Sequence, residues 1–521
     1  MSSPSKTVEQ KANIKNGIAR MVFSMLAILL QVVWILVLVR LFSDYAQWVS
    51  LTVSILALIL ALAIYSQDKT ASLKVPWIIL IMAFPLMGVT LYLLVGMSRS
   101  TKKMRQRYAD VDRILFPYLS QDEDTVRRFE EYDEGLSGIS RYLHNVGGYP
   151  VYSDTDIAFY PEAAEGLEAQ KEELRRARKF IFMEYYAIED KEAWKGVFDI
   201  LEQKVREGVE VRLFYDDIGS IAFINKDFVE RMENAGIQCK VFNPVSPVLN
   251  MFMNNRDHRK FMVIDGKIAF TGGYNLANEY FGITEPYGKW KDTGVRLEGE
   301  AVRTLTVLFL EMWNAVSKHY TPDPGDIGKY FTEFDHTAGK GFVQPYGDNP
   351  MGNEHIGENV YISMVEKSRR YCYFTTPYLI ITDEMNHAMG LAAKRGVDVR
   401  IITPGIPDKK VIYRVTRSYY PMLVKNGVRI YEYTPGFCHA KQCVVDDRAA
   451  TCGTINLDYR SLYHHFEDGC LFADCDAVAA VKQDFEDMFP ICREVTDKYR
   501  NRRFVPHRLG QLLLRVLAAL M

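Results

Sequence analysis

The sequence predicts an α/β protein in which a group of membrane-spanning helices precedes two tandem copies of one structural unit. Three observations on the 521-residue chain support this prediction. Three long uncharged stretches lie near its start, β-rich runs alternate with charged helical stretches behind them, and four sequence segments recur in the same order. Alternation of this kind is typical of α/β sandwich domains.

The uncharged stretches predict a membrane anchor over residues 1–100. They run from Met21 to Val39, from Tyr45 to Gln67 and from Val75 to Ser98. A transmembrane helix needs about 20 mainly apolar residues. We therefore expect two or three transmembrane helices, at about 21–42, 46–66 and 75–97, in a multi-pass protein of the cell membrane.

The basic residues do not decide on which side of the membrane the rest of the chain lies. If all three stretches cross, six Lys and Arg residues lie on each side, so the positive-inside rule gives a tie. The 8 Cys residues include no CxxC pair. This pattern disfavours a zinc site and fits free thiols in a reducing compartment. We therefore expect the catalytic domains to be cytoplasmic.

Two further segments predict contact with lipid. Residues 506–521 carry leucines at helical spacing, which predicts a helix in the membrane interface. A terminal helix docked on the body is an equally weighted alternative. The apolar run from Val248 to Met253 predicts a loop that dips into the bilayer, with a loop folded into the core as its alternative.

Composition limits the partners of the chain. Apolar residues make up 48% of it and charged residues 25%, which is typical of globular cores. The net charge is −2, so no global basic field indicates a nucleic-acid partner.

The chain behind the anchor repeats itself. ARKFIFMEYYAI at Ala177 resembles SRRYCYFTTPYLI at Ser368, and HRKFMVIDGKIAFTGGYNLANEY at His258 resembles HAKQCVVDDRAATCGTINLDYRS at His439. The offset stays between 181 and 191 residues. The repeat predicts a first domain over residues 101–325, a linker rich in Gly, Pro and Asp over 326–353, and a second domain over 354–505.

Local patterns predict the elements of the first copy. Phe180 to Tyr186 and Val209 to Tyr215 are apolar, β-rich runs that predict buried strands. Ala164 to Lys179 and Trp194 to Gly208 have the spacing of amphipathic helices.

Two of the ten histidines are followed by Lys at +2 and Asp at +7. Each set belongs to one copy of the repeat, and the candidate catalytic residues are His258, Lys260, Asp265, His439, Lys441 and Asp446. Residues i and i+2 of a strand point to the same face, so each His and its Lys should project into one site. Each Asp falls in the turn behind the strand, where a structural carboxylate fits better than a catalytic one.

Matched residues downstream complete the candidate site. Asn275 and Asn456 follow small-residue turns and could donate to phosphate oxygens. Asp292 and Glu467 align in the segments KDTGVRL and EDGCLF, where a carboxylate could orient an imidazole. Two His can supply a nucleophile and an acid for phosphodiester cleavage, and two Lys with two Asn can hold the phosphate. No metal and no cofactor are expected.

The two motif segments resemble the paired HKD motifs of the phospholipase D superfamily. Within it, TGGYNLANEY with KWKDTGVRLEG, and GFCHAKQCVVDD with GTINLDYRSLYHHFE, are similar to bacterial cardiolipin synthases. The resemblance implies two phospholipase D-like α/β sandwich domains that share one site. HHFE departs from the family, in which Asn is expected before the Phe.

The resemblance also implies a reaction. A phosphatidyl group passes from one phosphatidylglycerol to another through a phosphohistidine, with release of glycerol. His258 is implied as the nucleophile and His439 as the acid and then the base, although the near-symmetric copies do not order them. The expected partners are phosphatidylglycerol and the bilayer, without nucleic acid, and the oligomeric state stays open.

Four other functions are the alternatives. A phospholipase D-type hydrolase or another phosphatidyltransferase would use the same residues with a different acceptor. A phosphodiesterase acting on nucleic acid is disfavoured by the net charge and by the predicted anchor. A non-catalytic membrane scaffold is disfavoured because both motif sets are complete.

Overall fold

The computed structural model describes residues 46–93, 101–245, 255–316, 327–331 and 339–500, except 68 and 353. Seven isolated residues of the terminal segments are described as well, namely 26, 29, 30, 33, 37, 510 and 515. The predicted lipid-facing loop at Val248 to Met253 and the predicted first transmembrane helix at 21–42, apart from its isolated residues, lie outside the described residues.

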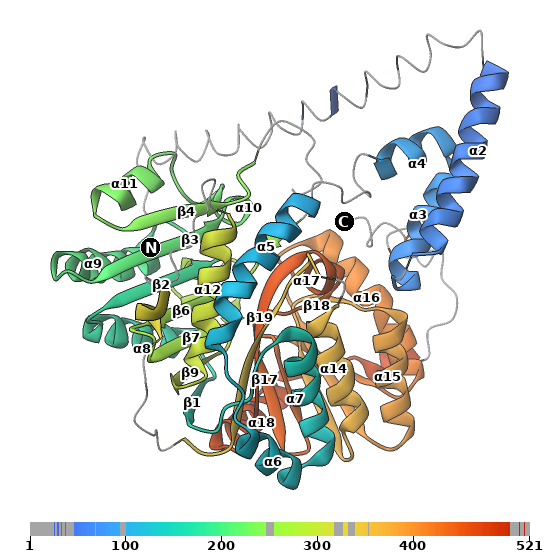
Figure 1. Cartoon of the computed structure of the whole chain (residues 1–521). Coiled ribbons are helices and arrows are strands. Elements are labelled where there is room, and N and C mark those ends of the chain that lie inside the picture. Colours follow the sequence, from blue (N-terminus) through green and yellow to red (C-terminus); the bar gives the residue numbers. More distant parts are fainter. Residues whose placement is uncertain are drawn as a thin grey trace.

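Each half of the chain forms a mixed β-sheet (Figure 1). Seven equivalent strands follow the same order in both halves, and β20 extends the edge of the second sheet. The first sheet has the order β1-β9-β7-β6-β2-β3-β4, with β1 Thr155–Tyr160, β2 Phe180–Tyr185, β3 Glu210–Asp216, β4 Gln238–Phe242, β6 Lys260–Ile264, β7 Ile268–Gly272 and β9 Gly294–Gly299. The second has the order β10-β19-β17-β16-β11-β13-β14-β20, with β10 Phe342–Asp348, β11 Tyr371–Thr375, β13 Asp398–Pro404, β14 Arg429–Tyr433, β16 Gln442–Val445, β17 Ala449–Gly453, β19 His465–Ala473 and β20 Cys492–Glu494. The predicted pair of tandem α/β domains is therefore confirmed.

Helices connect the parallel strands in the same way in both halves. The helices of the first half are α8 Ala163–Arg176, α9 Glu192–Arg206, α11 Phe228–Asn234 and α12 Val302–Ala315. Those of the second are α14 Ile356–Lys367, α15 Asp383–Lys394, α16 Lys410–Lys425 and α18 Asp476–Met488. The predicted strands match β2 and β3 within a residue, and α8 and α9 end two or three residues before the predicted helices do. Strand β2 is buried along its whole length, as its continuous apolar run predicts for a central strand.

One hydrophobic core joins the two halves. Helix α12 packs against β2, β6, β7 and β9 of the first sheet and against β10 of the second. Its side chains belong to a core cluster that continues into the second sheet. Because this core is continuous, the two sheets are held together as one body, and a site can be built between them.

The boundary predicted for the first domain needs correction. Residues 101–147 form α5 Thr101–Leu115, α6 Glu123–Tyr132 and α7 Glu134–Gly147. Gln344 Nε2 of β10 donates to the carbonyl oxygen of Ser140 in α7, and Arg448 pairs with Asp133 at 3.1 Å. Helices α6 and α7 therefore pack on the second half, although they precede the first half in the sequence (Figure 1).

The predicted linker over 326–353 is also wrong in part, because Phe342–Asp348 is the buried strand β10. It pairs with β19 in an antiparallel register from Phe342 opposite Ala473 to Asp348 opposite Glu467. Its Pro345 and Gly347 make the segment look like a linker. A strand at the edge of a sheet tolerates Pro, since one side of its backbone needs no partner strand.

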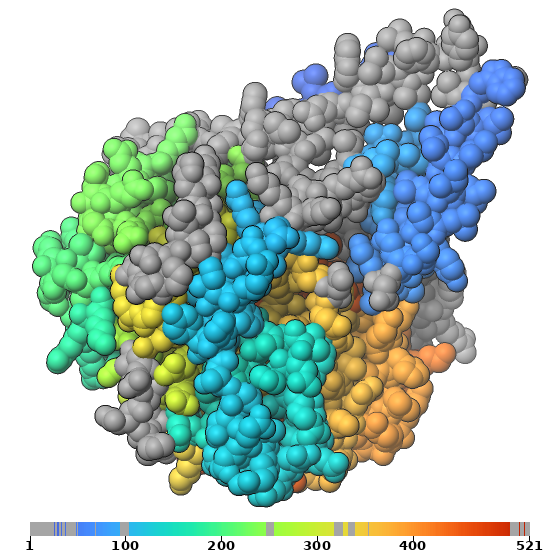
Figure 2. All heavy atoms as spheres, in the orientation of Figure 1, coloured from blue at the N-terminus to red at the C-terminus, as the bar shows by residue number. Residues whose placement is uncertain are grey.

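Within the described residues 46–93 of the anchor region, the chain forms the helices α2 Ala46–Tyr65, α3 Ala71–Ala83 and α4 Pro85–Leu91, which project from the body (Figure 2). Helix α2 matches the predicted helix at 46–66. The stretch predicted as one helix at 75–97 is instead interrupted at Phe84, before Pro85. Among the described residues, no helix meets the length and apolarity that a membrane crossing requires.

Residues 506–521 lie outside the described residues except Gly510 and Arg515. The Arg515 guanidinium lies over the Tyr419 ring at 4.2 Å and donates to Met422 Sδ at 3.3 Å. This contact with α16 favours the alternative in which the terminal segment docks on the body.

Candidate active site

Each motif histidine is positioned by backbone pairing with the other half of the chain. Strand β5 (Arg256–Asp257) pairs with β19, and β15 (Gly436–Cys438) pairs with β8 (Lys289–Lys291). Immediately beyond these pairs, the His258 amide donates to the Phe466 carbonyl at 2.8 Å, and the His439 amide donates to the Lys291 carbonyl at 2.7 Å. The two motifs are therefore related by the same approximate symmetry as the sheets.

The imidazoles are paired with acids in the same crossed way. His258 Nδ1 lies 2.9 Å from both carboxylate oxygens of Glu467, and His439 Nδ1 lies 2.6 Å from Asp292 Oδ2. The two histidines are only 7% and 6% exposed. Hydrogen bonding to a carboxylate assigns the ring proton to Nδ1, so Nε2 keeps its lone pair. Sequence reasoning proposed these acids as orienting groups, but it could not tell that each serves the histidine of the other half.

The residues after β7 and β17 make room for acids of different length. A Cβ atom at Gly273 would lie 2.0 Å from Asp292 Oδ1, so only glycine fits there. The equivalent position in the second half is Thr454, whose hydroxyl accepts from the Asp468 amide at 2.9 Å. The shorter acid is thus held against a glycine, and the longer one, Glu467, is accommodated beside a threonine.

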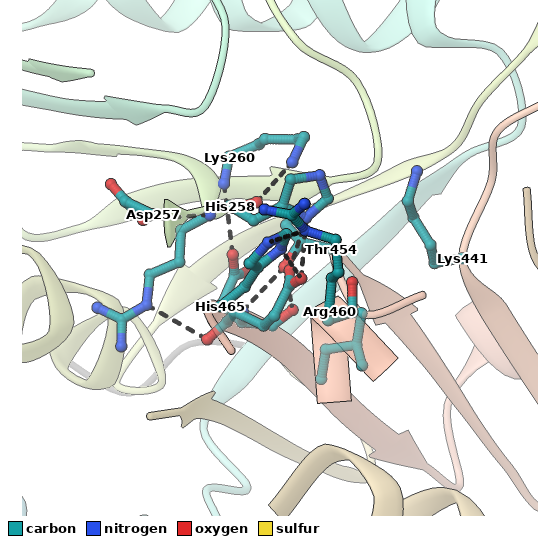
Figure 3. A network of polar contacts seen from close by, with 12 residues as sticks. Asp257, His258, Lys260, Lys441, Thr454, Arg460 and His465 are labelled. Atoms are coloured by element: carbon teal, nitrogen blue, oxygen red, sulfur yellow. Dashed lines mark hydrogen bonds and ion pairs between the residues drawn. The ribbon is translucent and has the colours of Figure 1, made fainter. Parts of the chain in front are cut away.

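Two buried lysines bring positive charge to the histidines. Lys441 Nζ lies 2.6 Å from His439 Nδ1, and Lys260 Nζ donates to the His258 carbonyl. Figure 3 shows Lys260 and Lys441 on opposite sides of His258. Burial lowers the pKa of Lys260 to about 8 and that of Lys441 to about 7, against the pull of the nearby carboxylates. Such lysines are suited to a phosphate, whose charge favours their protonated form.

The pKa shifts of the four paired groups differ between the two ends. Burial lowers the pKa of His258 well below its usual value, helped by Lys260, and lowers that of His439 to about 4, helped by Lys441. Burial raises the pKa of Glu467, whereas Lys441 and His439 outweigh burial and lower the pKa of Asp292. The charges of Lys441 and His439 also lower the pKa of His258, because the two motifs lie close together.

Asp265 and Asp446 have a structural role, because their carboxylates bind backbone amides. The Asp265 carboxylate accepts from three successive amides at the start of β2, Arg178, Lys179 and Phe180, at 2.7–2.9 Å. The Asp446 carboxylate accepts in the same way from Arg369, Arg370 and Tyr371 before and in β11, at 2.6–2.9 Å. Both Asp residues have φ of 55°. Their place among the candidate catalytic residues is therefore corrected to that of structural clamps, as their position in the turns suggested.

The two candidate phosphate-binding amides are not equivalent. Asn275 Oδ1 accepts from the Ala187 amide at 3.1 Å, and its Nδ2 donates to the Tyr280 hydroxyl at 2.7 Å. Asn456 Oδ1 is buried and has no hydrogen-bond partner in the part of the chain that the structure describes. Asn275 therefore acts within the protein. The atom that Asn456 keeps for a ligand is an acceptor, which could bind a hydroxyl of the substrate but not a phosphate oxygen.

Sequence reasoning missed the rings that flank the histidines. His465 lies beside His258, and Trp290 occupies the matching place beside His439, each with a ring-to-ring distance of 5.4 Å. Tyr186 and Tyr280 contact the same two histidines, at 4.8 Å and 5.3 Å. One indication of these neighbours was present in the sequence. In the motif HHFE, His465 stands where the family resemblance led us to expect Asn.

His258, His465 and Glu467 also form a group that could hold a metal ion. One ligand atom from each residue lies within 4.8 Å of the other two. Because the three residues come from two halves of the chain, their spacing in the sequence could not reveal them.

Comparisons with known proteins agree with this geometry. A family model described as "Cardiolipin synthase, PLD-like domain" matches residues 171–313 and 361–489. The chain is 41% identical to an uncharacterised protein of Streptococcus mutans over 88% of this chain and 98% of that protein. It is 33% identical to cardiolipin synthase 2 of Bacillus cereus over 89% of this chain and 90% of that protein.

The fold has a solved counterpart. The crystal structure of phosphatidylserine synthase from Haemophilus influenzae superposes with a TM-score of 0.56 at 17% identity, over 74% of this chain and 98% of that chain. This likeness concerns the fold alone. With two matched segments, crossed His–acid pairs and close relatives over most of its length, the chain belongs to the cardiolipin synthase family of phospholipase D-like proteins.

Proposed function

We propose that the protein is a cardiolipin synthase that transfers a phosphatidyl group from one phosphatidylglycerol to a second one and releases glycerol. The observation that best supports this function is the pair of buried histidines, in which Nδ1 of each ring is bound by an acid of the other half. This arrangement leaves two Nε2 atoms for chemistry beside two lysines. The name of the Bacillus cereus relative supports the choice of product.

In the first step, His258 Nε2 attacks the phosphorus of the donor lipid. The P–N bond forms as the P–O bond to the glycerol headgroup breaks. His439, which takes up a proton from solvent when the negatively charged donor phosphate binds beside it, gives that proton to the departing alkoxide. In the second step, the terminal hydroxyl of another phosphatidylglycerol gives its proton to His439 and attacks the phosphorus. The P–N bond then breaks, and His258 is neutral again. Lys260 and Lys441 balance the negative charge of both transition states.

The unequal acids support this division of roles. Asp292 has a lowered pKa and so carries a charge that can stabilise a protonated His439, as an acid–base catalyst requires. Burial lowers the pKa of both histidines, but only at the His258 end does it also raise the pKa of the paired acid, so that end favours a neutral imidazole more strongly. A neutral imidazole is the form that attacks phosphorus.

We extend the proposal to the membrane. Trp48, Ile59 and Leu62 of α2 are each more than half exposed, and burying such side chains in lipid would be favourable. All eight cysteines are free, which fits a cytoplasmic body. A membrane anchor over residues 1–100, with two or three crossings, and cytoplasmic domains would bring the site to the level of the lipid headgroups.

The test is a product analysis on vesicles of labelled phosphatidylglycerol with the full-length purified protein. Cardiolipin and glycerol in equal amounts would support the proposal. Phosphatidic acid as the main product would identify a hydrolase, and no product from either reaction would favour a scaffold. Activity should persist in a chelator, because Lys260 and Lys441 supply the positive charge. Loss in chelator with recovery only on adding a divalent ion would count against this role of the lysines.

A further inference from the structure

The His258 end of the site holds three side chains with donor atoms suited to a transition metal. Glu467 lies between two imidazoles, 2.9 Å from His258 Nδ1 and 3.6 Å from His465 Nδ1. His465 is 9% exposed, and its Nδ1 has no hydrogen-bond partner within the described residues. Figure 3 shows the two rings next to each other, with Arg460 and Thr454 beside them.

Arg460 orients the second imidazole. Its Nε donates to His465 Nε2 at 3.3 Å, which turns Nδ1 of that ring toward Glu467. Two imidazoles and one carboxylate are a common ligand set of Zn²⁺. In a tetrahedral site with Zn–N bonds of about 2.0–2.1 Å, ligand atoms lie about 3.3 Å apart. The two distances to Glu467 bracket this value, and the three ligand atoms all lie within 4.8 Å of one another.

We propose that His258, His465 and Glu467 form a binding site for a divalent transition-metal ion such as Zn²⁺, and that this ion inhibits the enzyme. A water molecule or an oxygen of the substrate phosphate completes the coordination. The inhibitory part of this proposal rests on the proposed function, because it requires His258 to be the nucleophile. The binding part does not.

Inhibition follows from where the ring proton goes. A metal at His258 Nδ1 needs the lone pair of that nitrogen, so the proton of the neutral ring moves to Nε2 through solvent. Nε2 is the atom that attacks phosphorus, and it then has no lone pair to offer. The same shift in His465 places a proton on Nε2, and Arg460 gives up its hydrogen bond. Metal and nucleophilic attack therefore exclude each other.

The neighbouring charges limit the affinity of this site. Lys260, Lys441 and Arg460 oppose a cation, and Arg460 also favours the His465 tautomer that the metal must displace. A dedicated zinc site instead surrounds the ion with acceptors. We therefore expect binding at micromolar concentrations of Zn²⁺ and little effect of Mg²⁺, which prefers oxygen ligands.

The other end of the same site provides an internal contrast. Trp290 pairs with Phe437 as His465 pairs with Arg256, so it occupies the position equivalent to His465. Its indole has no lone pair for a metal. His439 and Asp292 therefore make only a two-ligand set, and one Zn²⁺ per chain is expected at the site.

The experiment combines inhibition with binding on the full-length protein in detergent. Cardiolipin formation is measured against free Zn²⁺, relative to the metal-free rate of each variant, and Zn²⁺ binding is measured by calorimetry without lipid. The test variants are His465→Asn and His465→Gln. The control is His387→Asn, which removes an exposed histidine of α15. Thermal unfolding of each variant shows that it is folded.

We expect micromolar Zn²⁺ to inhibit the unaltered protein and EDTA to restore its rate. His465→Asn and His465→Gln should each raise the inhibitory concentration about tenfold or more, since loss of one of three ligands weakens metal binding at least as much as loss of a supporting contact. His387→Asn should change nothing. Equal inhibition of all variants, or none at all, would overturn the proposal. If no cardiolipin forms, the proposed function fails, and the calorimetric comparison alone decides whether the metal site exists.

Discussion

The two ends of the active site share one backbone and differ in their side chains. At both ends a parallel pair of strands from opposite halves delivers a histidine to an acid. At the His258 end the acid is Glu467, flanked by a second imidazole, His465. At the His439 end the acid is Asp292, flanked by the indole of Trp290.

This difference separates two contributions to the active site: the duplicated fold places the histidines, and the diverged side chains distinguish their roles. The repeated fold supplies two histidines in equivalent places, and symmetry alone would make them interchangeable. The acids and their neighbours break that symmetry, because only Asp292 has a lowered pKa. The comparison therefore predicts a nucleophile at one end and an acid–base catalyst at the other.

The largest effect is expected from the histidines themselves. His258→Ala and His439→Ala should each lower the transfer rate by at least about four orders of magnitude, because each removes an atom that forms or breaks a bond. Both variants should keep the thermal stability of the unaltered protein within a few degrees. Near-normal turnover by either variant would refute a shared site.

Substitution of the two acids should lower the transfer rate by different amounts at the two ends of the site. Asp292→Asn should lower the rate by about a thousandfold, since an amide cannot stabilise a protonated His439. Glu467→Gln should cost only about tenfold, because the amide oxygen still accepts from Nδ1 of a neutral His258. Steady-state rates on the same vesicles measure both. Equal losses would mean that the two carboxylates do the same work.

The lysines predict a pH dependence with a definite sign. An ammonium group is charged below its pKa, so Lys441 of the free enzyme loses its charge as the pH rises through about 7. The value of kcat/KM, which reports the free enzyme, should therefore fall by about tenfold per unit above this pH. Arginine stays protonated throughout this range. Lys441→Arg should lower the maximal rate but shift the decline toward the pKa of Lys260, about 8. An unchanged profile would rule out Lys441 as its source.

The smallest effect on catalysis is expected at the structural clamps. Asp446→Asn keeps a residue that tolerates positive φ but weakens three hydrogen bonds to the start of β11, so the free energy of unfolding should fall by about 1–3 kcal/mol. Asp447→Asn is the matched control, since Asp447 is next in sequence, exposed, and also has positive φ. The Asp447 carboxylate pairs with the exposed Arg370 side chain and accepts from the Tyr371 hydroxyl but binds no backbone amide of the described residues, so this change should cost about 1 kcal/mol or less. Denaturant titration measures both. A large loss of kcat in folded Asp446→Asn would restore this residue to the catalytic set.

The repeat made much of the fold predictable. Equivalent segments predicted equivalent domains, and apolar runs such as that of β2 predicted central strands. Two features resisted prediction for a physical reason. Strand β10 contains Pro345 and Gly347, which an edge position tolerates, and α6 and α7 pack on the half that follows later in the chain. Packing between distant segments leaves no local pattern.

The active site was predictable in its residues and not in its pairing. The two histidines and the two acids were recognisable because the same motif positions recur at matched spacing in both copies of the repeat. The crossed pairing arises from contacts between halves, such as the Phe466 carbonyl with the His258 amide, and no spacing encodes those. His465 and Trp290 could not be recognised as partners, since a symmetric pattern gives no reason to compare unlike residues.

The location of the covalent intermediate tests the account most directly. The enzyme is quenched during turnover of labelled phosphatidylglycerol, under alkaline denaturing conditions that spare a P–N bond, and the modified peptide is mapped. The account predicts one phosphatidyl group, on His258, which forms on the same residue but about tenfold more slowly in Glu467→Gln. A phosphatidyl group on His439 would contradict the division of roles between the two ends of the site.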